Sequence, residues 1–225
     1  MIRKAWWKAL SAVLLLYTFT AGFLIKVPHI GNLYGSIRNL FFHVPMWFAM
    51  MVLFIVSVVY AVKHLRNPTL NADIYSKEYA KTGIVFGTLG LITGAIWANF
   101  TWGEPWSNDP KQLLAAIAIL IYAAYFILRN SIPDMDKRAR IAAVYNVFAC
   151  AMLFPTLWII PRMVESLHPG GQGVEGNPGF NGKDLDPTMR MVFWPAVIGW
   201  TLLGVWITTL RIRLEQLTEK QLAND

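Results

Sequence analysis

Apolar and polar stretches alternate along the chain in long blocks. Six of the apolar runs are nearly free of charged residues, and the hydrocarbon core of a bilayer requires a helix of about 20 mostly apolar residues. These runs cover residues 10–25, 41–62, 84–100, 113–128, 141–160 and 191–210. The pattern predicts an all-α polytopic membrane protein, a single domain over residues 1–225 built as a bundle of six transmembrane helices.

The first run resembles a secretory signal, because it follows the basic residues Arg3, Lys4 and Lys8. The stretch TAGFLIKVP at its end offers no convincing cleavage site between small residues, and five further apolar runs follow. We therefore expect the first run to be a retained signal anchor. The one cysteine, Cys150, leaves no partner for an intrachain disulfide. There is also no Cys-x-x-Cys-His motif, which excludes a covalent c-type cytochrome.

Composition and charge indicate the surroundings and the orientation of the bundle. The chain is 56% hydrophobic and 15% charged, which favours membrane lipid as its solvent. Lys and Arg are retained on the cytoplasmic side of membranes. Placing both termini in the cytoplasm puts fourteen of the twenty Lys and Arg residues on that side, so we expect this orientation. The net charge of +7 follows from the topology and gives no reason to expect nucleic acid as a partner.

Three connectors are expected on the outer side, and most of the unusual residues lie in them. They cover residues 26–40, 101–112 and 161–190, and the last contains six glycines and four prolines. A connector of that length is more often functional or mobile than inert. In the third run and at the residue directly before it, small residues recur on one helical face and predict close packing against a neighbouring helix. These are Gly83, Gly87, Gly90 and Gly94.

Two histidines on the outer side are candidate metal ligands. His43 lies in RNLFFHVPMWF at the start of the second run, and His168 lies in SLHPGG just beyond the fifth. One imidazole from each could ligate a haem iron on opposite faces. The alternative is that each is a structural histidine with a hydrogen-bond partner. His29 is a spare candidate, and His64, on the inner side, is expected to be solvated.

The connector TWGEPWSNDPK has the composition of a rigid aromatic shelf. Trp102 and Trp106 are four residues apart and project to one side if the segment is helical. Gly103 allows close backbone approach, and Asp109 before Pro110 can cap the next helix. We predict that these residues form a platform for a flat, partly apolar cofactor. The alternative is that the tryptophans belong to the aromatic belt at the membrane surface.

Basic residues near the outer surface suit a cofactor that carries carboxylates. Arg38 and Lys111 are expected to pair with the two carboxylates of a haem, which would be costly near a bilayer without basic partners. The alternative is that both residues contact phospholipid headgroups.

Taken together, four motifs resemble the haem-handling membrane proteins that are marked by a tryptophan-rich WWD loop, and in particular CcmC of cytochrome c maturation. They are HVP at His43, WGxxWxxD at 102–109, LHPG around His168 and DPTMR at 186–190. The resemblance implies that His43 and His168 are the axial ligands of the haem iron. It also implies that the WWD loop binds the haem edge, here with Trp102, Gly103, Trp106 and Asp109, and that Trp97 is the aromatic residue on the approach to this loop.

One position departs from the family pattern. The loop commonly has a further tryptophan directly before its aspartate, whereas this chain has Asn108. We expect this difference to weaken the stacking surface.

The resemblance implies a non-enzymatic function. The protein would bind haem b as transient cargo at the periplasmic face of the bacterial inner membrane and deliver it to the haem chaperone CcmE. CcmA, CcmB and CcmD would be the other subunits. The chain has no Gly-x-x-x-x-Gly-Lys-Ser/Thr loop, so any ATP-driven step belongs to another chain. Release of haem is expected when the glycine-rich loop moves His168 off the iron.

Two other classes of function stay open. A b-type membrane cytochrome would transfer electrons, but such proteins usually place their histidines within helices, whereas these lie beside loops. A small-solute transporter subunit would require ionisable residues at mid-membrane depth, and the six runs contain few.

Overall fold

The fold is an α-helical bundle in which the predicted membrane-spanning segments are helices. The computed structural model describes residues 5–29, 31–168 and 185–222. This part of the chain contains no strand and has six helices long and apolar enough to cross a membrane, which confirms the predicted fold class. The helical elements, in chain order, are α1 (Trp6–Leu24), η1 (Gly31–Asn39), α2 (Leu40–Arg66), α3 (Leu70–Trp102), α4 (Pro110–Ser131), α5 (Met135–Phe154), η2 (Pro155–Ile159), α6 (Ile160–Met163) and α7 (Pro187–Leu222).

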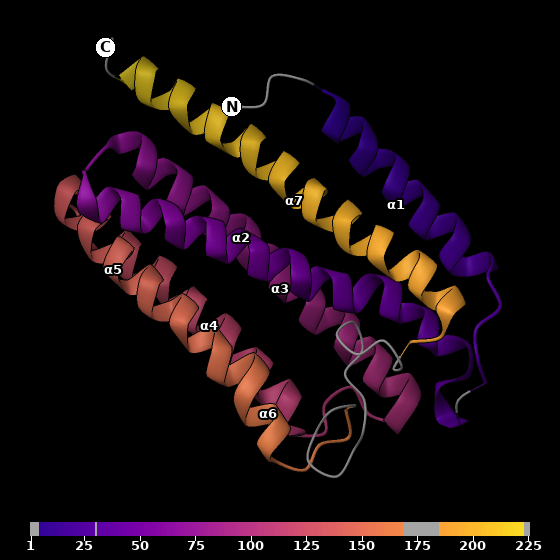
Figure 1. The fold of residues 1–225 in the computed structure, drawn as a ribbon. Helices are drawn as coiled ribbons and strands as arrows, with labels where there is room; N and C mark the ends of the chain where they lie inside the picture. The colour runs from indigo at the N-terminus through magenta and orange to yellow at the C-terminus, as the bar shows by residue number, and fades with distance from the viewer. Residues whose placement is uncertain (1–4, 30, 169–184, 223–225) are drawn as a thin grey trace.

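The long helices that follow one another along the chain run antiparallel, so that α2 and α7 lie parallel to each other (Figure 1). The pair α2 and α3 forms the centre of the bundle, α7 packs against it with α1 on the outside, and α4 and α5 cover the other side. Several helices are longer than the apolar runs: α3 begins at Leu70, and α7 continues to Leu222. Hydropathy detects only the part of a helix that lies in the hydrocarbon, so polar helical extensions escape it.

The glycine face of α3 is packed by side chains of α2, which confirms the predicted role of these glycines. A methyl group added at Gly83 would lie 2.7 Å from the Phe54 ring, and one at Gly90 would lie 2.8 Å from the Trp47 ring. At Gly94 the neighbour is the imidazole of His43, 2.7 Å from the added atom. The close packing of α2 against α3 therefore also fixes the position of His43, one of the two candidate metal ligands.

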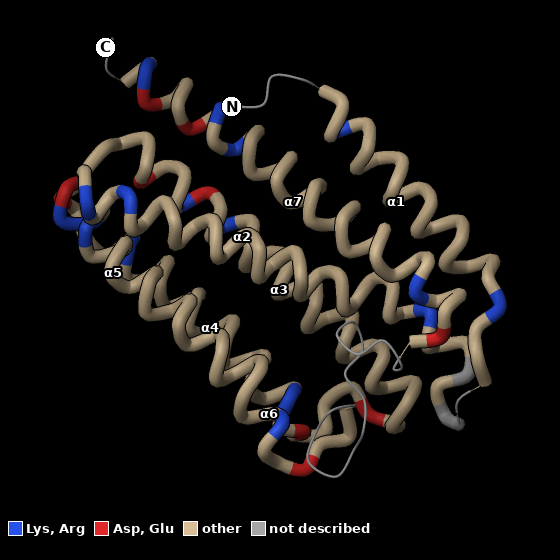
Figure 2. The backbone as a smooth tube through the Cα atoms, viewed as in Figure 1, with Lys and Arg blue, Asp and Glu red and all other residues tan. Residues whose placement is uncertain are grey.

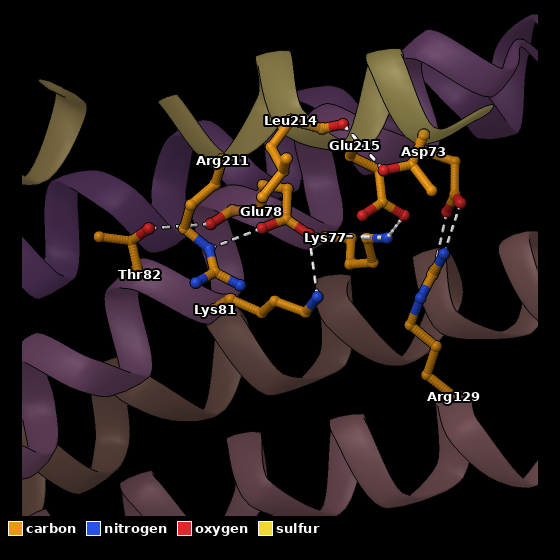
Figure 3. A network of polar contacts seen from close by, with 10 residues as sticks. Asp73, Lys77, Glu78, Lys81, Thr82, Arg129, Arg211, Leu214 and Glu215 are labelled. Carbon is orange, nitrogen blue, oxygen red and sulfur yellow. Dashed lines mark hydrogen bonds and ion pairs between the residues drawn. The ribbon is translucent and has the colours of Figure 1, made fainter. Parts of the chain in front are cut away.

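Charged side chains gather at the end of the bundle where α2 turns into α3 and α4 turns into α5 (Figure 2). Glu78 of α3 is only 1% exposed and accepts from Arg211 Nε of α7 at 2.7 Å. Lys81 lies 3.0 Å from the other oxygen of Glu78. Lys77 pairs with Glu215 of α7. These contacts clamp α3 to α7 at the end rich in Lys and Arg (Figure 3).

A second clamp joins α3 to α4 at the same end. Arg129 of α4 donates to both carboxylate oxygens of Asp73, one of them at 2.8 Å. His64 is also held here: it is 8% exposed and its Nδ1 lies 3.1 Å from the carbonyl oxygen of Thr69. The expectation that His64 is solvated is therefore wrong, because α3 begins earlier than its apolar run and the turn before it folds over the imidazole.

Candidate functional site

A cavity of about 670 Å³ lies at the opposite end of the bundle and brings the two candidate histidines together. Its volume is within the range of about 300–1,000 Å³ that is usual for small-molecule and cofactor sites. The walls are mainly aromatic and aliphatic and come from α2, α3, the start of α4, η2 and α6. Of the predicted site residues, those that line it are His43, Trp97, Trp102, Trp106, Lys111 and His168.

His43 lies in the first turns of α2, which begins at Leu40. Its Nδ1 is 3.0 Å from the carbonyl oxygen of Gly90 and 3.3 Å from Thr93 Oγ1. Because a carbonyl can only accept, Nδ1 carries the proton in this arrangement and Nε2 keeps its lone pair. The edges of Trp47 and Trp97 flank the ring, at centroid distances of 6.3 and 5.9 Å. The imidazole is thus fixed with the lone pair of Nε2 on the side opposite the hydrogen bond.

His168 follows α6 and is fixed by a carboxylate. Its Nδ1 lies 2.8 Å from Asp109 Oδ1, and its main-chain N–H donates to Ser166 Oγ at 3.1 Å. The Trp102 ring meets the imidazole edge-on with centroids 4.7 Å apart. A carboxylate on Nδ1 is the usual arrangement around metal-binding histidines, since it leaves Nε2 for the metal. The glycine-rich residues 169–184 beyond His168, expected to move it, lie outside the described residues.

Asp109 is buried, with 5% of its surface exposed, and does not line the cavity. Its carboxylate accepts hydrogen bonds from several residues. As predicted, it caps α4, accepting from the Lys111 N–H at 2.9 Å. It also accepts from the Ser166 hydroxyl and from the Leu167 N–H at 2.6 Å. Burial opposes ionisation, but the donors His168, Leu167 and Ser166 outweigh it and hold the pKa of Asp109 well below its usual range. The carboxylate was predicted to bind the haem edge; here it holds His168.

The loop between α3 and α4 is not helical, which was the condition for Trp102 and Trp106 to project to one side. Helix α3 ends at Trp102, and Gly103 takes the left-handed conformation with φ +88°. A methyl group added at Gly103 would meet nothing within 4 Å, so its role is backbone conformation and not close approach. Trp106 reaches the cavity from the loop itself. The two indoles therefore line one cavity without sharing a helical face.

Gln112 links this loop to α4 by hydrogen bonds. It was not among the predicted site residues. Its Nε2 donates to the Pro105 carbonyl at 3.2 Å, and its Oε1 accepts from the N–H and hydroxyl of Ser107 at 3.0 and 3.1 Å. Gln112 also lines the cavity and is buried. A single glutamine in a first helical turn carries no sequence signal for such a role.

The local structure explains why asparagine, and not the tryptophan of the family pattern, stands at position 108. Asn108 has φ +55°, and its side chain accepts from the Trp106 indole N–H at 3.1 Å. Asparagine is several-fold enriched in the left-handed region among residues other than glycine, whereas a bulky residue there is an outlier. Asn108 thus turns the chain into Asp109 and orients Trp106.

The basic residues at the cavity are not the pair that was predicted. Arg38 is absent from the cavity lining, because its Nη1 donates to the Gly22 carbonyl at the end of α1 at 2.7 Å. Lys111 does line the cavity, together with Arg162 of α6. The Arg162 guanidinium lies 5.0 Å from the centre of the Trp158 ring and donates to the Trp158 carbonyl. The two cationic side chains that line the cavity are therefore Lys111 and Arg162.

The depressed pKa of Asp109 predicts a pH dependence of stability. A carboxyl whose pKa falls on folding contributes stability above its unfolded pKa, about 4, and loses it as the pH falls toward the folded value. We expect the wild type to melt at a higher temperature than Asp109→Asn at pH 5, and this difference to shrink as the pH falls below about 4. Melting curves of both proteins in detergent measure this, and a difference that does not change down to pH 3 would contradict it.

Comparison with known proteins gives a family match and several partial relatives. Residues 4–169 match the family described as Cytochrome C assembly protein. A protein of Thermosynechococcus vestitus named cytochrome c biogenesis protein CcsA is 45% identical over 108 residues, which is 47% of this chain and 32% of that protein. A CcsA of Prochlorococcus marinus (strain MIT 9515) is 42% identical over 86 residues, 38% of this chain and 28% of that protein. The matched region thus spans about a third or less of these relatives.

The names of these relatives correct one prediction. The partners CcmE, CcmA, CcmB and CcmD were expected because the motifs resemble CcmC, whereas these relatives are named CcsA. That prediction of partners is wrong. The four motifs carry no information on the surfaces that bind other subunits, so they could not decide the partners.

Proposed function

This chain belongs to the cytochrome c assembly protein family, and from that premise we propose that its cavity binds haem b as cargo and passes it to an acceptor during cytochrome c maturation. The observation that carries the proposal is that His43 and His168, from elements far apart in sequence, line the same cavity. Each has its Nδ1 at a hydrogen-bond acceptor, Gly90 or Asp109. The motifs that resemble CcmC and the similarity to CcsA both fit a haem carrier that is not an enzyme.

The donors and walls of the cavity suit an iron porphyrin. Two neutral imidazoles are common axial ligands of haem iron. The indoles of Trp97, Trp102 and Trp106 supply flat apolar surface, and Lys111 and Arg162 supply the cations that propionates need outside water. A hydrophobic cavity with a few placed polar groups is the usual form of a cofactor site.

We further propose that the cavity opens on the periplasmic side of the bacterial inner membrane and that residues 1–225 act as one domain. The support is the charge distribution, since Lys and Arg gather at the end of the bundle opposite the cavity (Figure 2). Basic residues of this kind mark the cytoplasmic side. Haem bound at the outer end would be within reach of a periplasmic acceptor.

A titration with two porphyrins tests the proposal. The protein purified in detergent should bind ferric haem saturably and give a low-spin spectrum. Protoporphyrin IX without metal has the same shape and propionates but no axial bonds. Even about 1.4 kcal/mol from the two bonds corresponds to tenfold weaker binding of the metal-free compound. Equal affinity for the two compounds, or no low-spin spectrum, would overturn the proposal.

A substitution that does not remove a ligand should also weaken haem binding. In Gly94→Ala the new methyl group would lie 2.7 Å from His43 Cε1 and displace the imidazole. We expect loss of the low-spin signal. The matched control is Gly83→Ala on the same face of α3, whose methyl group would lie equally close, 2.7 Å, to Phe54. Haem spectra of both variants decide the matter, and equal behaviour of the two would contradict the prediction.

A further inference from the structure

We propose that Asp109 is a positioning residue that makes His168 the stronger of the two iron ligands, so that the axial pair is chemically unequal. This inference rests on the proposed haem binding. It differs from the role that the motif resemblance implies, in which the aspartate belongs to the surface that contacts the haem edge.

Asp109 contacts three successive residues of the segment that ends in His168, and these contacts fix the segment. The carboxylate accepts from the Ser166 hydroxyl at 2.9 and 3.0 Å, from the Leu167 N–H at 2.6 Å and from the His168 ring at 2.8 Å. It is itself anchored at the first turn of α4 by the Lys111 N–H. The ring of His168 is therefore positioned from a helix terminus and not by its own loop alone.

A second contact sets the rotation of the same ring. Trp102, the last residue of α3, meets the His168 imidazole at 67° with centroids 4.7 Å apart. Asp109 holds one edge of the imidazole and Trp102 borders it at an angle. A ring constrained from two directions presents Nε2 along one line, which is the preorganisation that a metal ligand needs.

The two histidines face acceptors of different strength. His43 Nδ1 lies beside the neutral carbonyl of Gly90 at 3.0 Å, whereas His168 Nδ1 lies beside a buried carboxylate at 2.8 Å. Hydrogen bonds to an ionised acceptor are about twice as strong as those between neutral groups. A carboxylate on Nδ1 increases the basicity of the opposite nitrogen and so its donation to a metal. Stronger electron donation from His168 Nε2 would stabilise ferric iron more than ferrous iron, because the ferric ion carries the higher charge.

The reduction potential of the bound haem measures this donation. Asp109→Asn removes the charge but keeps a side chain that caps helices well. Loss of an outer carboxylate typically costs 10–100-fold in metal affinity. We expect ferric haem to lose about tenfold in affinity relative to ferrous haem, which for one electron is a shift of about +59 mV. The ferric haem dissociation rate should rise by a similar factor, and both quantities are read on the isolated complex.

Asp134→Asn is the matched control. Asp134 also caps a helix, α5, by accepting from the Lys137 N–H at 2.8 Å, and it follows the end of α4 opposite to the one that Asp109 caps. The control should leave the potential and the dissociation rate unchanged. Ser166→Ala removes the hydroxyl that bridges Asp109 and the His168 N–H but keeps the carboxylate. Because Asp109 then loses a donor and becomes a stronger acceptor for His168, we expect a smaller shift of the opposite sign, toward a lower potential.

The outcomes separate the two proposals. A wild-type protein that shows no low-spin haem overturns the proposed function. A low-spin wild type with equal potentials in Asp109→Asn and Asp134→Asn overturns only the role of Asp109. If Asp109→Asn does not fold, Ser166→Ala decides: a negative shift supports the inference, and an unchanged or higher potential overturns it.

Discussion

Replacing His43 or His168 by alanine is expected to abolish the low-spin spectrum of the haem complex. Each substitution removes one of the two imidazoles that line the cavity, and a haem with one strong axial ligand changes spin state and loses affinity. We expect at least about a tenfold loss of ferric haem affinity for each variant, since an iron–imidazole bond is worth more than the 1.4 kcal/mol that a factor of ten represents. Optical spectra and haem titration of the purified variants measure both effects.

His29→Ala is the control for this experiment. His29 is exposed and precedes α2, and it does not line the cavity. Its replacement should leave the spectrum and the affinity unchanged. Unchanged low-spin spectra in His43→Ala and His168→Ala, with both proteins folded, would contradict ligation by these histidines. A loss confined to one variant would leave a single protein ligand on the iron.

Replacing Glu78 by glutamine is expected to destabilise the bundle by about 3 kcal/mol, because removing one partner of a buried ion pair costs about 3–5 kcal/mol. The carboxylate is 1% exposed and lies among Lys77, Lys81 and Arg211. Arg211 and Lys81 are partly exposed and recover some hydration, which places the loss at the lower end of the range. Unfolding in mixed detergent measures the free energy.

Asp136→Asn provides the comparison for Glu78→Gln. Asp136 is an exposed carboxylate in the first turn of α5, where its removal is expected to cost at most about 1 kcal/mol. Haem affinity should be unchanged in both variants, because the charged clamps and the cavity occupy opposite ends of the bundle. Similar losses of stability in the two variants would contradict the importance assigned to the buried carboxylate.

The membrane fold was predictable from the sequence because hydropathy responds to lipid exposure, and all six runs fall within the helices apart from Ile25, one residue past α1. The helix ends were not predictable in the same way. Helix α3 gains more than three turns before residue 84, and these turns carry Asp73, Lys77 and Glu78. Their charged side chains pair with residues of α4 and α7, and such contacts between helices cannot be read from hydropathy.

The cavity was predictable only in part. The order of the apolar runs predicted that His43 and His168 lie at the same end of the bundle, and the structure places both at one cavity. The contact between Asp109 and His168 spans 59 positions, and no local pattern encodes it. The choice between Arg38 and Arg162 depends on which way each side chain points: Arg38 turns to the end of α1, and Arg162 lies over Trp158.

The break in α-helical geometry after α5 has a rotational consequence. The π-helical element η2, Pro155–Ile159, contributes Thr156, Leu157 and Trp158 to the cavity wall, and α6 follows it directly. An α-helix turns about 100° per residue, and a π-helical turn absorbs one additional residue. The side chains of α6 are therefore rotated about the helix axis by roughly 100°, relative to where an uninterrupted α5 would place them. This one additional residue sets the direction in which Arg162 points at the cavity, and an uninterrupted helix with the same side chains would point its guanidinium elsewhere.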